Sequence, residues 1–209
     1  MTLELIISIF VTLLVTIDPL GMVPIFVSLT VGMTPQQKRT VAIRSSVIAL
    51  VVLAVFALFG EKVLSVLGIT LPAFRTAGGL MLLWIGFEMV FEKRGIRKTA
   101  TAERAVSDKH VNDVAAFPLA IPLMAGPGAI TATMLIAAKG NGDWIVLGTL
   151  IGIIAALLLM CTAVFILSGR IEKLIGETGR IVLSRLLGVI LAALAVQYIA
   201  DGVIQLART

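Results

Sequence analysis

Charged residues are scarce in this chain of 209 residues: Asp, Glu, Lys and Arg together make up 14% of it. A soluble domain usually has about a quarter charged residues, so the composition argues against a soluble globular protein. Cysteine occurs once, at Cys161, and histidine once, at His110. A lone cysteine excludes an internal disulfide, and no Cys/His spacing typical of a metal site is present. We therefore expect no bound metal and no cofactor.

Enzyme signatures are also missing. The chain has no HExxH, GxSxG, GxxxxGK[ST] or GxGxxG sequence, and these mark zinc hydrolases, serine hydrolases, phosphate-binding loops and dinucleotide-binding folds. We predict that the protein is not an enzyme and, on this chain alone, not an ATP-driven pump. The net charge of +5 comes without the aromatic and basic interleaving typical of RNA-binding modules. Nucleic acid is therefore not an expected partner.

Long apolar runs fill most of the chain. Hydrophobic residues make up 59% of it, and its mean hydropathy is +1.09. A run of about 18 apolar residues is enough to cross a bilayer core about 30 Å thick. We predict an all-α membrane protein with six transmembrane helices in one integral membrane domain, residues 1–209. The predicted spans cover residues 5–29, 43–59, 71–91, 114–138, 144–167 and 181–203.

The linkers between these spans differ in charge. The first, third and fifth linkers hold three, six and three Lys or Arg residues, if Arg44 at the start of the second span is counted with the first linker, whereas the second, the fourth and the C-terminal tail hold one each. Basic linkers stay on the cytoplasmic side of a membrane. We therefore expect a multi-pass protein of the cell inner membrane with both termini outside, on the periplasmic side, and the lipid bilayer as its partner.

Two halves of three helices each are predicted, over residues 1–91 and 114–209, with a flexible cytoplasmic linker at residues 92–113. Pro19 and Pro127 are 108 residues apart, and Arg75 and Arg185 are 110 apart. Each pair falls at the same place in its half. Because three is an odd number, equivalent halves must insert with opposite orientation. The result is an inverted repeat, which many secondary transporters share.

The first span contains the sequence Asp18-Pro19-Leu20-Gly21, followed by Pro24. Proline lacks an N–H group and glycine adds flexibility, so we predict a break in this helix near the membrane centre. A carboxylate at that depth costs roughly 2.5–3.5 kcal/mol on insertion scales, so Asp18 should face inward. Two roles are open to Asp18: capping the second half-helix, or direct contact with a solute or ion.

The fourth span has a matching break. Three prolines and two glycines fall within eleven residues, in Pro118-Leu119-Ala120-Ile121-Pro122 and then Gly126-Pro127-Gly128. The N–H groups after Gly126 and Gly128 open a new half-helix, whose positive dipole end can hold a carboxylate or other anion. Two breaks at matching positions predict a substrate site where they cross; paired kinks used only for packing are the alternative. Thr131 either lines this site or bonds back to its own helix.

We predict a substrate site formed by residues at the two breaks: Asp18, Pro19, Gly21, Pro24, Gly126, Pro127, Gly128 and Thr131. Arg75 and Arg185 open the third helix of each half. They are either candidate gates at the two mouths or interfacial side chains that extend to water. Gly148 and Gly152 form a GxxxG spacing, which is typical of close helix packing.

The two proline-glycine motifs, Asp18-Pro19-Leu20-Gly21 and Pro118-Leu119-Ala120-Ile121-Pro122, resemble those of the MarC family of bacterial and archaeal membrane proteins. The resemblance includes Gly78-Gly79 and Asp201-Gly202 and covers nearly the whole chain. It implies a six-helix inner-membrane protein, and some members are similar to transporters of small neutral amino acids. We expect such a secondary transporter, coupled to H⁺ or Na⁺, that holds a zwitterion such as alanine or glycine. The alternative is a non-transporting assembly or regulatory protein whose basic central loop contacts partners.

Overall fold

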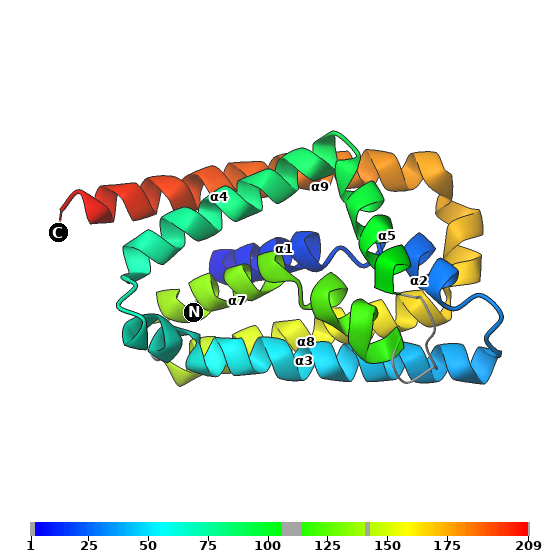
Figure 1. Ribbon diagram of the computed structural model, residues 1–209. Coiled ribbons are helices and arrows are strands. Elements are labelled where there is room, and N and C mark those ends of the chain that lie inside the picture. The colour runs from blue at the N-terminus through cyan, green and yellow to red at the C-terminus, as the bar shows by residue number, and fades with distance from the viewer. Residues whose placement is uncertain (1–2, 106–113, 141–142, 209) are drawn as a thin grey trace.

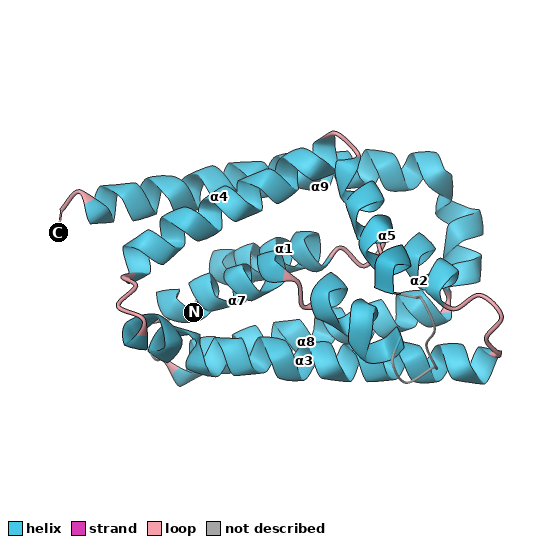
Figure 2. Cartoon of the chain, in the orientation of Figure 1, coloured by secondary structure: helices cyan, strands magenta, loops and turns pink. Residues whose placement is uncertain are grey.

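The computed structural model describes residues 3–105, 114–140 and 143–208, and all regular structure in these ranges is helical (Figures 1 and 2). The part of the predicted linker at residues 106–113, with His110, lies outside the described residues. The elements are α1 (Leu3–Ile17), α2 (Val23–Leu29), α3 (Pro35–Val66), α4 (Leu71–Val90), α5 (Lys93–Ala105), η1 (Ala115–Met124), α7 (Pro127–Lys139), α8 (Trp144–Ile166) and α9 (Ser168–Leu206).

Four helices are long and apolar enough to cross a membrane: α3, α4, α8 and the Gly176–Leu206 part of α9. A fifth span results if η1 and α7, which are bent by 57° relative to each other, count as one. The apolar helix α1 has 15 residues, which at 1.5 Å per residue gives a length of about 22 Å. The break after α1 therefore leaves it shorter than a bilayer core of about 30 Å.

The long helices form two pairs, and the two short half-helices lie between them. In Figure 1, α4 runs beside α9 on one side of the molecule and α3 beside α8 on the other, with α1 and α7 in the middle. The half-helix α1 contacts α7, α8 and α9, and α7 contacts α3 and α4. The two half-helices next to the breaks, α1 before the first and α7 after the second, are thus enclosed by the long helices.

Glycines bring α4 and α9 close together along an antiparallel seam. A Cβ atom on Gly188 would lie 2.9 Å from the Gly86 carbonyl oxygen, and one on Gly86 would lie 3.0 Å from the Gly188 oxygen. Further along the seam, a Cβ on Gly79 would lie 2.9 Å from the Ala195 oxygen. Backbones can approach this closely only where side chains are absent, as at many helix interfaces in membranes.

The α3–α8 pair is joined differently. Thr162 Oγ1 donates a hydrogen bond of 2.7 Å to Ser46 Oγ across the interface. The spacing of Gly148 and Gly152 predicts close packing on α8, but a Cβ on either glycine would meet no atom within 4 Å. That prediction is wrong for contacts within the described chain, because the packed face of α8 is set by larger residues such as Phe165, which stacks on Phe26 of α2 at 4.6 Å.

Several helices run beyond their predicted apolar spans. Helix α3 begins at Pro35, where Thr34 and Gln37 form a reciprocal capping box, a motif that satisfies free backbone donors at a helix start. Helix α9 begins at Ser168 and is interrupted at Gly176, whose φ of 65° lies in the left-handed region. Hydropathy marks only the apolar part of a helix, whereas polar residues continue it past the apolar boundary.

The outward faces of the long helices are apolar. On α3, the exposed side chains Val47, Val51, Val55 and Leu58 recur every three or four residues, so they lie along one face. Exposed apolar surface of this extent on several helices is unusual for a soluble monomer and fits contact with lipid.

Candidate functional site

The predicted break in the first span is present. Helix α1 ends at Ile17, and Asp18 adopts a φ of 58°, a left-handed conformation that Asp tolerates better than most residues. Asp18 Oδ1 accepts a hydrogen bond of 3.0 Å from the Gly21 N–H. A Cβ on Gly21 would lie 2.1 Å from Asp18 Oδ2, so a side chain at this position would displace the Asp18 carboxylate. The N-cap position of α2 is held by Met22; Asp18 caps the turn before it.

The second break lies between η1 and α7. Phe117 and Ile121 have extended backbones, and each precedes a cis-proline. The segment ends at Ala125, and Gly126 is the N-cap of α7 with Pro127 in the first turn. A Cβ on Gly126 would lie 2.3 Å from the Pro122 oxygen. The chain therefore needs a glycine to fold back so tightly before it starts a new helix.

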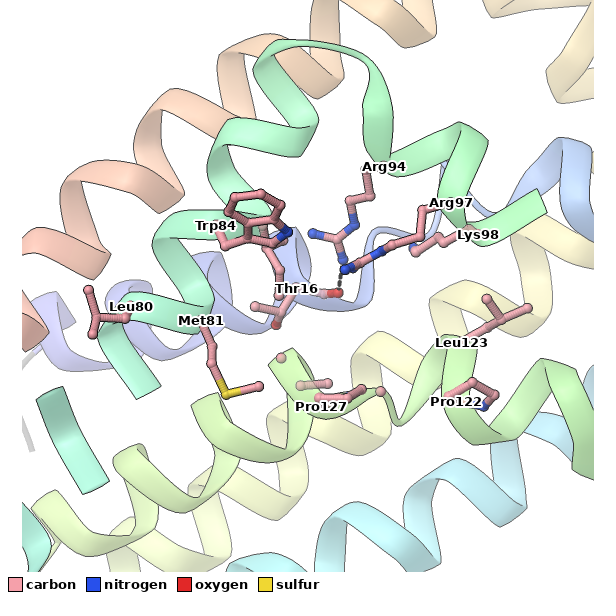
Figure 3. Close-up of a pocket in the computed structure, with 14 residues that line it drawn as sticks. Thr16, Leu80, Met81, Trp84, Arg94, Arg97, Lys98, Pro122, Leu123 and Pro127 are labelled. Carbon is pink, nitrogen blue, oxygen red and sulfur yellow. Dashed lines mark hydrogen bonds between the residues drawn. The ribbon is translucent and has the colours of Figure 1, made fainter. Parts of the chain in front are cut away.

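A pocket of about 580 Å³ lies beside the second break, between α4, α5 and the end of α1 (Figure 3). Its volume is in the range of about 300–1,000 Å³ that is common for small-molecule sites. Its wall is apolar along α4 and cationic along α5, and its lining residues in the described chain include no carboxylate. The lining residues are Thr16, Leu80, Met81, Trp84, Ile85, Arg94, Arg97, Lys98, Pro122, Leu123, Gly126, Pro127, Gly128 and Ala129.

Two buried cations of α5 reach the end of α1. Arg94 is 5% exposed and Lys98 7% exposed. Lys98 Nζ lies 3.5 Å from Asp18 Oδ2, and Arg94 Nε lies 3.9 Å from the same oxygen. The Arg94 guanidinium also donates to the Thr16 carbonyl, and Lys98 Nζ donates to the Ile17 carbonyl at 3.4 Å. Helix ends leave carbonyls without helical partners, and these cations bind two of them.

A second ion pair borders the pocket. Arg97 lies 3.0 Å from Glu88 Oε2, and Trp84 Nε1 donates to Glu88 Oε1 at 3.1 Å. The three cations Arg94, Arg97 and Lys98 thus face two carboxylates, Asp18 and Glu88. The two buried cations, Arg94 and Lys98, share the single carboxylate of Asp18.

Burial, together with the nearby Arg94 guanidinium, lowers the pKa of Lys98 from 10.5 to about 8, although the Asp18 carboxylate opposes the shift. Water no longer stabilises the charged amine. The ammonium of Lys98 therefore loses its proton at a pH far closer to neutrality than an exposed lysine would.

The structure divides the predicted site residues into two groups. Gly126, Pro127 and Gly128 line the pocket. Asp18 lies behind the cations, which separate its carboxylate from the pocket lining. Pro19 and Gly21 lie in the same turn, and Pro24 lies in the first turn of α2. Thr131 is buried in α7 against Gly78 of α4.

The predicted gates lie apart from the pocket lining. Arg75 is 8% exposed within α4, and its Nε donates no hydrogen bond in the described part of the chain. Arg185 is exposed and forms an ion pair with Glu92, just after α4. An exposed ion pair of this kind contributes little to stability. A gating role for either arginine stays a prediction.

Sequence reasoning missed Arg94 and Lys98, because both fall in the predicted linker. Residues 93–105 form α5, which packs against α2, α4 and η1. A signal was present, since two cations four residues apart share one helix face. The need for counter-charges at Asp18 and at the open carbonyls of α1 explains why this polar helix lies against the bundle.

The long apolar helices, their lipid-type outer faces and the helix breaks between them define a multi-pass integral membrane protein of the helical class. The sequence profile described as "MarC family integral membrane protein" matches residues 3–207. The chain belongs to the MarC family.

Relatives from archaea and bacteria match along nearly their whole lengths. A UPF0056 membrane protein of Methanocaldococcus jannaschii is 35% identical over 97% of this chain and 98% of its own length. The UPF0056 membrane protein YvbG of Bacillus subtilis is 31% identical over 97% of this chain and 95% of its own. YhcE of Escherichia coli is 29% identical over 93% and 89%. No solved structure matches the chain.

Proposed function

We propose that this protein is a secondary transporter of small neutral amino acids, or of similar small solutes, in the cell inner membrane. The observation that carries the proposal is the pocket of about 580 Å³ that the second helix break forms with α4, α5 and the end of α1. Broken helices expose backbone donors and acceptors at membrane depth, which is tolerated only inside protein or beside a water-filled cavity. Transporters commonly build their solute sites from such paired breaks.

The contacts between helices support two equivalent halves with inverted topology. Each helix of the first half lies against its predicted counterpart: α1 against α7, α3 against α8 and α4 against α9. The remaining contacts include matched pairs, such as α4 with α7 and α1 with α9. A two-fold axis between the halves would produce this pattern. In this proposal α1 and α2 together form the sixth span, and alternating access is a movement of one half against the other.

Uptake of radiolabelled alanine into proteoliposomes tests the proposal. We expect the wild type to accumulate alanine under an imposed H⁺ or Na⁺ gradient, and Gly126→Leu to abolish uptake, because its side chain would displace the Pro122 carbonyl at the pocket wall. Asp18→Asn keeps an acceptor for the Gly21 N–H but removes the charge next to Arg94 and Lys98. We expect it to reduce uptake strongly.

Gly148→Leu is the matched control, because Gly148 faces open space on α8; it should transport like the wild type. Unchanged uptake in both Gly126→Leu and Asp18→Asn would show that the site is wrongly assigned. Wild-type vesicles that take up neither alanine, glycine nor any other small neutral amino acid would remove the transport proposal.

The competing function is that of a non-transporting assembly or regulatory protein. It uses the basic central region as a partner surface, but the Arg94 and Lys98 side chains of that region are buried in the molecule. Deleting residues 99–107 separates the two functions, because Arg94 and Lys98 remain. If the protein is a transporter that uses the pocket, alanine uptake should survive the deletion. If neither the wild type nor the deletion variant transports alanine, and the deletion abolishes co-purification of a partner, the alternative is favoured.

A further inference from the structure

We propose that Arg94 and the first turn of α7 together form a carboxylate-binding site, which makes a single carboxylate with a small apolar tail the chemical class of solute that the pocket accepts. This inference deepens the proposed function, since it takes the pocket as the solute site. It assigns recognition of the solute to the polar helix α5, which lies outside the apolar spans, and to the positive charge of the side chains that α5 places at the pocket.

The first element of the site is the start of α7. Its first intrahelical bond runs from the Ile130 N–H to the Gly126 oxygen at 3.0 Å. The N–H groups of Gly128 and Ala129 precede this bond, so they have no carbonyl within the helix to bind. Both residues line the pocket. Free N–H groups and the positive end of a helix dipole attract an anion.

The second and independent element is the guanidinium of Arg94. This side chain is 6% exposed, yet its Nε donates no hydrogen bond in the described structure. One terminal nitrogen donates to the Thr16 carbonyl, and the other to Met89 Sδ at 3.3 Å. A thioether sulfur is a weak acceptor, so the guanidinium retains donors for a stronger one. Figure 3 shows Arg94 directed into the pocket, with Pro127 on the opposite wall.

The charge balance favours an anion over an ammonium group. Asp18, the carboxylate expected to hold an ammonium, is already paired with Arg94 and Lys98. Glu88 is paired with Arg97. Arg94 and Lys98 thus share one carboxylate, and a bound anion would give these two buried cations a second negative partner. A carboxylate suits Arg best, because its two oxygens match the two parallel donors of a guanidinium.

The apolar wall sets the rest of the solute. Met81, Trp84 and Ile85 of α4 line the pocket beside the cations. A carboxylate held between Arg94 and α7 would place an alkyl group of a few carbons against this wall, where burial is favourable at about 25 cal/mol per Å². Propionate and alanine share this carboxylate and tail, and they differ only in the ammonium group.

The test measures binding of three probes to the purified full-length protein in detergent by calorimetry: sodium propionate, alanine and alaninamide. Propionate should bind at least as tightly as alanine, because the described pocket lining offers no carboxylate to the ammonium group. Alaninamide, which lacks the carboxylate, should not bind. Binding of alaninamide comparable to that of propionate would overturn the inference. Sodium chloride that competes as well as propionate would also overturn it, because the site would then recognise charge alone.

Variants locate the site. Arg94→Gln should weaken propionate binding by about tenfold or more, since charge-assisted bidentate hydrogen bonds are lost, and Arg94→Lys should recover part of the affinity. Arg185→Gln is the control, because Arg185 is an exposed arginine that does not line the pocket. If Arg94→Gln unfolds, Arg94→Lys still tests the inference: wild-type affinity in that variant would contradict a bidentate arginine contact.

The outcomes separate this inference from the transport proposal. Alanine uptake that persists at the wild-type rate in a folded Arg94→Gln protein would remove the carboxylate site and leave the transporter intact. If propionate binding depends on Arg94 but the protein transports no solute, the carboxylate site stands and the transport proposal is wrong.

Discussion

Asp18 combines a backbone role and an electrostatic role in one side chain. Its left-handed conformation and the bond from the Gly21 N–H shape the turn after α1, and its other oxygen faces Arg94 and Lys98. Removing one member of a buried ion pair leaves an uncompensated charge, at a cost of about 3–5 kcal/mol. The sequence alone left both roles open, because a carboxylate next to a proline fits each of them.

Lys98 makes solute binding pH-dependent at the residue scale. Its pKa of about 8 means that the ammonium form dominates below pH 8 and is lost above it. A bound carboxylate stabilises the ammonium and raises this pKa, so binding near pH 8 should be accompanied by proton uptake. The groups that share this environment are Asp18, Arg94 and Cys161.

We therefore expect the affinity for propionate to fall as the pH rises from 7 through 9, and calorimetry in buffers of different ionisation enthalpy to report proton uptake. Lys98→Met should remove this dependence, while Lys62→Met, a change of an exposed lysine in α3, should preserve it. An affinity independent of pH across this range in the wild type would contradict the role of Lys98.

At the scale of elements, glycines decide how closely α4 and α9 approach. A Cβ on Gly188 would lie 2.9 Å from the Gly86 oxygen and 2.8 Å from Met89 Cβ. Both neighbours are rigid parts of the opposing helix, so the helices must separate to admit a methyl group. Because α4 also carries the apolar wall of the pocket, this seam links packing to the shape of the site.

We expect Gly188→Ala to lower the free energy of unfolding by about 1–3 kcal/mol, the usual cost of overpacking. Gly148→Ala, in open space on α8, should be neutral or stabilising by up to about 1 kcal/mol, because alanine favours helix. Thermal denaturation in one detergent compares the two. Equal stability of the two variants would show that the α4–α9 seam tolerates a side chain.

Helix α5 shows how an element can be hidden by its composition. Its 13 residues are so polar that hydropathy does not predict them as part of a membrane bundle. They pack against α2, α4 and η1 because the break in α1 presents a carboxylate and open carbonyls that need cations. The same break that shortens α1 thus creates the position that α5 occupies.

For the whole molecule, the distribution of basic residues predicts an orientation in the membrane. The cytoplasmic side should hold the linker after α2, and the outer side the linker after α3. Val31, in the linker after α2, and Val66, the last residue of α3, are matched probes of the two sides, since they are 76% and 87% exposed.

In a Cys161→Ala background, a membrane-impermeant maleimide added to intact cells should label Val66→Cys and spare Val31→Cys. Permeabilised cells should label both. Labelling of Val31→Cys alone in intact cells would show that the orientation is opposite to the predicted one. Helix α5 and the pocket would then be accessible from the other side of the membrane.

The sequence by itself determined the membrane class, the helical fold and the positions of the two breaks. These features depend on composition and on local chemistry: apolar runs long enough for a bilayer, and prolines and glycines that no continuous helix accommodates. Gly126, Pro127 and Gly128 could be predicted at the site for the same reason, because a helix start is a local property.

Only the tertiary structure decided what surrounds these breaks. It placed Arg94 and Lys98 at Asp18, from 76 and 80 residues further along the chain, and thereby gave the pocket a cationic wall where the sequence suggested a free carboxylate. Within the part of the chain that the structure describes, it also left no atom within 4 Å of a Cβ placed on Gly148 or Gly152. The physical reason is that the charge of a buried site is the sum of the charges of side chains from segments that are distant in sequence. Only the packing of the helices determines which of these segments meet.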